Sequence, residues 1–221
     1  MRCRIGAAVV TFAALACVSE MALGVPVAQR ELDWVLKRTP DLEKGAKLYE
    51  TCAACHGKGG EGVADGSVPA IAGQYFTVVA KQLVDFRSRA RRDPRMEHFA
   101  GTRQLAYSQY IADVSAYISS LPRPTSDRIS SADVMDRGGV VYARACERCH
   151  GAAGEGKEDG LAPRLASQHV EYLIQQLDSA VSGWRPTMQD THAARLADLS
   201  RKDIVAVASY LSGLGTFATA N

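Results

Sequence analysis

Two short segments of this chain, residues 52–56 and 146–150, carry the same order of reactive side chains, Cys-x-x-Cys-His. These side chains are Cys52, Cys55 and His56 in one segment and Cys146, Cys149 and His150 in the other. Two thiols about one helical turn apart can each form a thioether to a vinyl group of one haem, and the next imidazole can reach its iron. The spacing therefore predicts two covalently bound haem c groups, with both histidines as axial ligands.

A structural zinc site and a thioredoxin-type redox site are the alternatives for these segments. Four nitrogen or sulfur ligands must converge on one zinc ion, but Cys52 and Cys146 lie 146 − 52 = 94 residues apart and each pair is followed by its own histidine. A thioredoxin-type site needs a βαβ setting, whereas helical patterns surround both segments. Haem is favoured over both alternatives.

Two methionines are candidates for the sixth coordination position of the irons. Met96 follows His56 by 40 residues and Met188 follows His150 by 38, each close after a proline. We expect both to lie in irregular, stiff loops from which a thioether can reach the open face of the iron. The rival ligands are His98 in the first half and His192 in the second. Neither has a counterpart in the other half, so we expect both, like His169, to be surface residues.

The first 24 residues have the pattern of an export signal. Arg2 and Arg4 precede an apolar run over residues 5–18, and small residues permit cleavage after Gly24. At 14 residues the run is short for a membrane span. We therefore expect a periplasmic protein released by a cleaved signal at 1–24. A retained anchor and lipidation at Cys17 stay open, and either would allow peripheral association with the membrane.

The cysteine count agrees with export and haem attachment. Of six cysteines, Cys3 and Cys17 leave with the signal and the other four are used by the two haems, so no disulfide is expected. The chain holds 26 Lys and Arg against 24 Asp and Glu. This near-neutral balance lacks the basic excess of nucleic-acid-binding proteins and argues against a nucleic-acid partner.

The elements around the two segments repeat along the chain, and their apolar spacing is that of amphipathic helices. The expected helices are 41–52 and its repeat from 136 into Cys146, then 75–89 and 170–181, then 109–121 and 201–214. The lead-in at 25–40 is weakly helical. We predict an all-α protein with domains at 25–121 and 131–221, joined by a Pro-rich linker at 122–130. Each domain would wrap around one haem.

Glycines precede both cysteine segments. Gly45 and Gly139 each lie seven residues before the first cysteine, and glycine is disfavoured inside helices unless another element approaches closely. A close helix crossing is therefore expected at both.

Five arginines crowd just before Met96. They are Arg87, Arg89, Arg91, Arg92 and Arg95. The cluster is able to guide an acidic redox partner or to pair with haem propionates, and a solvated helix end is an equally good interpretation.

The chain after its signal resembles the dihaem cytochrome c4 family, which has two class I cytochrome c domains in tandem. The likeness rests on the doubled Cys-x-x-Cys-His, on the Pro-x-x-Ala-Gly/Ser-Gln segments at 69–74 and 163–168, and on Arg-x-Asp-Pro-x-Met at 91–96. The Tyr-Ile/Leu-Ser-x-Leu endings of the two halves add to it. The lead-in before Gly45 is longer than the family pattern.

The resemblance implies several contacts in each domain. The axial pairs would be His56 with Met96 and His150 with Met188. The carbonyls of Pro69 and Pro163 would orient the two histidines. Close packing would join Gly45 to Tyr117 and Gly139 to Tyr210.

Haem irons with all six positions filled cannot bind a substrate, so we expect an electron-transfer protein and not an enzyme. Its role would be a shuttle from a quinol-oxidising complex towards a terminal oxidase. The alternative is a dihaem subunit of a flavoprotein dehydrogenase, such as flavocytochrome c sulfide dehydrogenase. A dihaem enzyme is the weakest alternative, because no spare cysteine remains for unusual ligation.

Overall fold

A computed structural model describes residues 27–125, 130–159 and 161–214. The expected signal at 1–24 lies outside these residues. The regular structure in these ranges is helical, with one isolated antiparallel bridge in each half, at Val63–Val68 and Lys157–Ala162. None of the described helices has the length and apolar character needed to cross a membrane. The predicted all-α fold is confirmed.

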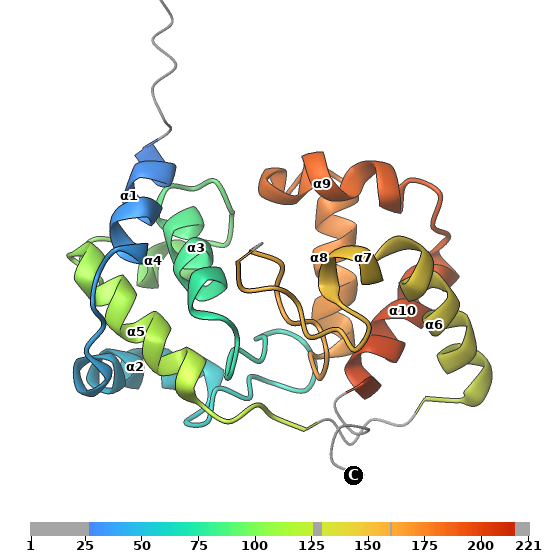
Figure 1. The fold of residues 1–221 in the computed structure, drawn as a ribbon, viewed down its shortest axis with the longest axis horizontal. Coiled ribbons are helices and arrows are strands. Elements are labelled where there is room, and N and C mark those ends of the chain that lie inside the picture. Colours follow the sequence, from blue (N-terminus) through green and yellow to red (C-terminus); the bar gives the residue numbers. More distant parts are fainter. Residues whose placement is uncertain (1–26, 126–129, 160, 215–221) are drawn as a thin grey trace, which may run out of the picture.

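The helices gather in two lobes, α1 to α5 in one and α6 to α10 in the other (Figure 1). The first lobe has α1 (Val27–Leu36), α2 (Leu42–His56), α3 (Phe76–Arg87), α4 (Pro94–Phe99) and α5 (Ser108–Ser120). The second has α6 (Ala132–Ala145), α7 (Glu147–His150), α8 (Val170–Val181), α9 (Pro186–Leu196) and α10 (Arg201–Gly213). In each lobe the helix that leads to the cysteines packs on the last helix, α2 on α5 and α6 on α10.

The first crossing is formed at Gly45. A Cβ atom there would collide with the carbonyl oxygen of Asp113 and with the Cβ of Tyr117. Asp41 caps the start of α2, since its side chain accepts a hydrogen bond from the Lys44 N–H. The backbones of α2 and α5 therefore touch where glycine alone fits.

The second crossing is formed at Gly138, and its assignment to Gly139 was wrong. A Cβ on Gly138 would collide with the Ala206 carbonyl oxygen and the Tyr210 Cβ, whereas one on Gly139 would lie 3.3 Å from the edge of the Tyr210 ring. The physical reason is a break in the helix. Helix α2 continues through both of its cysteines, whereas α6 ends at Ala145 and a new helix, α7, begins at Glu147. This break adds one residue between the glycine at the crossing and the first cysteine of the second lobe.

The lead-in contributes to the core of the first lobe. The weakly helical segment expected at 25–40 contains α1, which packs against α3 and α5. Its Val35 is fully buried and its Leu32 nearly so. The second lobe has no such additional helix among its described residues, so the two lobes are unequal copies.

Candidate haem-binding sites

Both histidines of the repeated segments are held by a proline carbonyl. His56 Nδ1 lies 3.0 Å from the Pro69 oxygen, and His150 Nδ1 lies 3.0 Å from the Pro163 oxygen. A carbonyl only accepts hydrogen bonds, so Nδ1 must carry the proton in each ring. The lone pair is therefore on Nε2, the atom left to bind a metal.

Burial keeps these imidazoles neutral. Each is only 7% exposed. Removal from water lowers the pKa of His56 and of His150, and the hydrogen bond to the proline carbonyl only partly opposes this shift. Both rings are thus in the form that coordinates iron at neutral pH.

The chain turns sharply after each histidine. Gly57 and Gly151 have φ of 81° and 79°, a left-handed conformation that glycine adopts without strain. The Tyr49 hydroxyl donates to the Gly57 carbonyl at 2.7 Å, and Tyr142 donates to Gly151 in the same way. Each of these tyrosines also packs on the last helix of its lobe, Tyr49 against Tyr117 and Tyr142 against Tyr210. The ring centroids of Tyr49 and Tyr117 are 5.3 Å apart. The crossing of the helices thereby fixes the position of the histidine.

The four described cysteines form no disulfide, and each pair has one partly buried and one exposed side chain. Burial raises the pKa of Cys52 and of Cys146 to about 11. A thioredoxin-type site requires the opposite shift, so that alternative is disfavoured. Within the described ranges, no three His, Cys, Asp or Glu side chains converge as metal ligands, which disfavours zinc. Paired thiols beside an available Nε2 fit a c-type haem.

The candidate methionine ligands lie on helices. The expectation that they lie in irregular loops was therefore wrong. Met96 is the third residue of α4 and Met188 the third of α9, and both helices begin with proline. Proline fixes φ near the helical value and its missing N–H is not needed in the first turn, so it starts these helices instead of preventing them.

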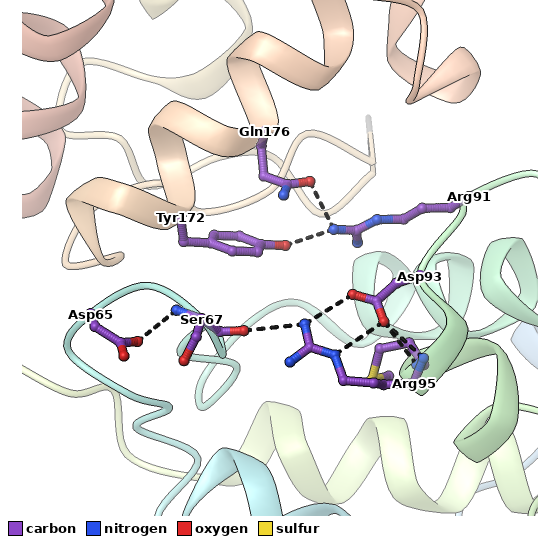
Figure 2. Close-up of polar contacts among 8 residues, drawn as sticks. Asp65, Ser67, Arg91, Asp93, Arg95, Tyr172 and Gln176 are labelled. Carbon is purple, nitrogen blue, oxygen red and sulfur yellow. Dashed lines mark hydrogen bonds and ion pairs between the residues drawn. The ribbon is translucent and has the colours of Figure 1, made fainter.

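The two methionine helices differ in how they begin. Asp93 caps α4, because its side chain accepts hydrogen bonds from the backbone N–H of Arg95 and of Met96. Its carboxylate also pairs with the Arg95 guanidinium at 3.2 Å (Figure 2). The corresponding residue of α9 is Arg185, which makes no side-chain cap. The first turn of α4 therefore has a side-chain cap that the first turn of α9 lacks.

The three other histidines were all expected at the surface. His98 is exposed, which confirms that expectation for it. His169 is partly buried at the boundary between the lobes, with Nε2 2.8 Å from the Glu61 carbonyl oxygen. His192 is also partly buried and its ring centroid lies 6.2 Å from that of His150. The surface expectation was therefore wrong for His192, whereas His169 keeps part of its surface accessible.

The two lobes meet through a polar network with approximate two-fold symmetry. Arg91 donates to Gln82 of its own lobe at 2.6 Å and to Tyr172 and Gln176 of the other at 2.7 and 2.9 Å. Arg185 donates to Gln176 at 2.8 Å and across the boundary to Gln82 at 3.0 Å. Figure 2 shows Arg91 reaching Tyr172 and Gln176 from the opposite lobe. Burial, followed by the neighbouring Arg91, lowers the pKa of Arg185 to about 10.

A second symmetric contact joins the segments that follow the two prolines. Gln168 accepts from the Ala70 N–H at 3.0 Å and donates to the Ala70 carbonyl at 2.7 Å. Gln74 makes the same pair of bonds to the backbone of Arg164, both at 3.0 Å. Since these segments also supply the proline carbonyls, the supports of the two histidines are tied directly to each other.

The arginine cluster is not one docking surface. Arg87 is buried against Glu31 and the Leu105 carbonyl, and Arg91 belongs to the boundary between the lobes. Of the others, Arg89 and Arg92 are exposed and both pair with Glu97.

Sequence reasoning did not predict the contact between the lobes, although a signal for it was present. The residues that form this contact occur as equivalent pairs, each 94 positions apart in the sequence. The pairs are Arg91 and Arg185 (185 − 91 = 94), Gln82 and Gln176 (176 − 82 = 94), and Gln74 and Gln168 (168 − 74 = 94).

Comparison with known proteins gives consistent matches. The Cytochrome c family model matches residues 42–122 and 135–215. Cytochrome c4 of Azotobacter vinelandii is 31% identical over 191 residues, covering 79% of this chain and 89% of its own. A thiosulfate dehydrogenase electron acceptor of Stutzerimonas stutzeri (strain A1501) is 33% identical over 177 residues, covering 74% and 79%.

A solved structure matches both lobes together. The crystal structure of reduced recombinant cytochrome c4 from Pseudomonas stutzeri superposes with a TM-score of 0.70 at 28% identity, covering 79% of this chain and 99% of that one. Helix α1 precedes the first segment matched by the family model. The chain belongs to the dihaem cytochrome c4 family, with two tandem cytochrome c domains and two covalently attached haem c groups.

Proposed function

We propose that this dihaem electron-transfer protein is periplasmic and carries electrons from a quinol-oxidising complex towards a terminal oxidase. The observation that supports this most is the doubled donor set: in each domain a histidine is fixed through Nδ1 with Nε2 left for iron. The export pattern at 1–24 supports the location. The domain division at 25–121, 122–130 and 131–221 is part of the proposal.

We also propose which residues would hold the haems. Thioethers would form at Cys52 and Cys55 in the first domain and at Cys146 and Cys149 in the second. The axial pairs would be His56 with Met96 and His150 with Met188. Each bound haem supplies a one-electron iron couple, and a methionine ligand raises its potential. The proline carbonyls hold the imidazoles in the correct tautomer, and the buried helix crossings keep them in place.

The contact between the domains supports transfer within one molecule. The hydrogen bonds of Gln74 and Gln168 join the two histidine supports, and the pair Arg91 and Arg185 adds bonds in both directions. A boundary held by this many directed contacts limits relative motion of the domains. The distance between the two cofactors would therefore be nearly constant during reduction and oxidation.

The experiment is rapid mixing of the purified, oxidised protein with a quinol-oxidising complex and quinol, followed by addition of a terminal oxidase. We expect both haems to be reduced and then reoxidised within the turnover time of the complexes. Haems that stay oxidised with the quinol-oxidising complex, or stay reduced with the oxidase, would exclude the shuttle role.

A second candidate is the dihaem electron acceptor of a dehydrogenase, either a flavoprotein or one that oxidises thiosulfate. A relative that carries the name thiosulfate dehydrogenase electron acceptor favours it, and so does a surface feature. Trp34 of α1 is 59% exposed and Tyr107 is 65% exposed, and both line an open cavity of about 580 Å³. Exposed aromatic side chains beside a cavity are typical of protein contact sites.

The two candidates differ in what reduces the protein. A dehydrogenase acceptor is reduced by the dehydrogenase with its substrate, but not by the substrate alone. Co-elution of the native protein with a dehydrogenase during size-exclusion chromatography would favour this candidate over a free shuttle. Elution of the native protein alone would favour the shuttle.

A further inference from the structure

The rings of His150 and His192 lie at the separation of two imidazoles on one metal ion. Their centroids are 6.2 Å apart, with an angle of 48° between the planes. Two imidazoles that each bind one metal through a bond of about 2 Å have centroids roughly 6 Å apart. The separation of the two rings is therefore compatible with both imidazoles holding one iron.

The hydrogen bonds of the two rings agree with this arrangement. His150 Nδ1 is engaged by the Pro163 carbonyl at 3.0 Å, and His192 Nδ1 lies 3.2 Å from the Met188 carbonyl. Both partners are acceptors, so each ring carries its proton on Nδ1 and its lone pair on Nε2. His192 thus has the tautomer and the kind of support that the proposed ligand His150 has.

His192 shares a helix face with the proposed ligand Met188. The two are four residues apart on α9, and side chains at that spacing lie one above the other. The first domain provides a comparison: Ala100 stands four residues after Met96, and it is fully buried in the core. The nearest histidine there, His98, is exposed and contacts Gln104. Only the second of the two sites, among the described residues, combines both kinds of donor.

The helices that carry the two methionines also begin differently. Met96 is restrained by the Asp93 cap, while α9 begins without a side-chain cap. A side-chain cap stabilises the first turn of a helix. The first turn of α9 is therefore easier to move than that of α4.

We propose that the second haem exchanges its sixth ligand with oxidation state: His192 binds the ferric iron and Met188 binds the ferrous iron. This rests on the proposed axial set. His192 Nε2 would hold the iron in the oxidised protein, and Met188 Sδ would take its place after a redox partner supplies one electron. The imidazole would leave neutral, so no proton is required. Thioether ligation favours ferrous iron relative to bis-histidine ligation, which gives the direction of the exchange.

The test is the near-infrared methionine-to-iron band of the ferric protein, compared with the ligated methionine methyl signals in the proton NMR spectrum of the reduced protein. The proposal predicts a ferric band with half the intensity expected for two haems, and two methyl signals after reduction. A full-intensity ferric band, or one methyl signal in the reduced state, contradicts the exchange.

Variants separate the two ligands. His192→Ala should double the ferric band, and Met188→Leu should leave the ferric band unchanged while removing one reduced-state methyl signal. His98→Ala is the matched control and should change neither spectrum. A halved band in Met188→Leu, together with an unchanged band in His192→Ala, contradicts the exchange. Because the two variants act on different side chains, failure of one to fold, judged by haem content and circular dichroism, leaves the other decisive.

Failure of the underlying ligand set gives a different result. Met96→Leu should abolish the ferric band, since the exchange leaves that residue as the one methionine on ferric iron. A ferric band that survives in Met96→Leu and disappears in Met188→Leu would refute the proposed axial set and the exchange together. If the ferric band is lost in Met96→Leu and is not halved in any other variant, the result supports both the proposed axial set and the exchange.

Discussion

The crossing of α6 and α10 allows two adjacent glycines to be distinguished by substitution. A Cβ atom on Gly138 would collide with the Ala206 carbonyl oxygen and the Tyr210 Cβ, which belong to backbone or lie next to it. On Gly139 it would approach only the edge of the Tyr210 ring, at 3.3 Å. We expect Gly138→Ala to destabilise the second domain and Gly139→Ala to be tolerated.

The magnitudes follow from two opposing effects. Overpacking costs about 1–3 kcal/mol, and replacing glycine by alanine inside a helix returns up to about 1 kcal/mol. Because a Cβ on Gly138 would overlap the Ala206 carbonyl oxygen, the upper end of the overpacking cost applies, and the net loss for Gly138→Ala is about 2 kcal/mol (3 − 1). Gly139→Ala should lie between no change and a gain of about 1 kcal/mol. For a domain near 100 residues, 1 kcal/mol changes the midpoint of thermal unfolding by roughly 4–8 °C.

Thermal and guanidinium unfolding of the haem-loaded protein, followed by circular dichroism and by the haem absorbance of ferrous protein, measure the effect. Gly45→Ala in the first domain is a second test, since its Cβ would meet Asp113 and Tyr117 in the same way. If Gly139→Ala were the destabilising variant and Gly138→Ala neutral, the register of α6 described above would be refuted.

Three further predictions concern the cap, the domain boundary and acid stability. Asp93→Ala removes the cap of α4 and should lower the free energy of unfolding by about 1 kcal/mol. On heating, the ferric methionine band of the first haem should then disappear at a lower temperature. If the band disappeared at the same temperature as in the unchanged protein, the cap would have no role in holding Met96. Gln168→Ala leaves the Ala70 backbone groups unpaired and should cost about 1–3 kcal/mol, with a larger radius of gyration by X-ray scattering; an unchanged radius would show that the other contacts suffice. Hydrogen bonds from Ser200, followed by Arg137, hold the pKa of Asp203 below its usual range. The contribution of ionised Asp203 to the free energy of unfolding is present above the unfolded-state pKa near 3.9 and is lost as pH falls through the lower folded-state pKa. Asp203→Asn should therefore flatten the plot of unfolding free energy against pH below about pH 4. An unchanged slope of that plot would contradict this.

Much of the site could be predicted from the sequence because its parts are local. Each Cys-x-x-Cys-His segment contains both cysteines and the histidine within five consecutive residues, so the sequence alone indicates a haem site. The family comparison confirms the haem groups and the tandem all-α fold. The crossing at Gly45 was predicted because α2 runs without interruption into its cysteines. The same counting failed for Gly139, since a break between two helices adds a residue that spacing alone does not reveal.

What could not be predicted depends on contacts between distant residues. The bonds from Arg91 to Tyr172 and from Gln168 to Ala70 join segments more than 80 positions apart, at 172 − 91 = 81 and 168 − 70 = 98. Likewise His192 was placed at the surface because it lacks a counterpart in the first domain. Its approach to His150 depends on how α9 lies in the fold, which periodicity does not specify.

The most direct test of the central claim, that two coordinatively saturated haems make this chain an electron carrier, is an optical redox titration of the purified haem-loaded protein with carbon monoxide added at the reduced end. The account predicts two one-electron steps, low-spin spectra throughout and no spectral change on adding carbon monoxide. A single one-electron step, or a ferrous haem that binds carbon monoxide readily, would contradict it.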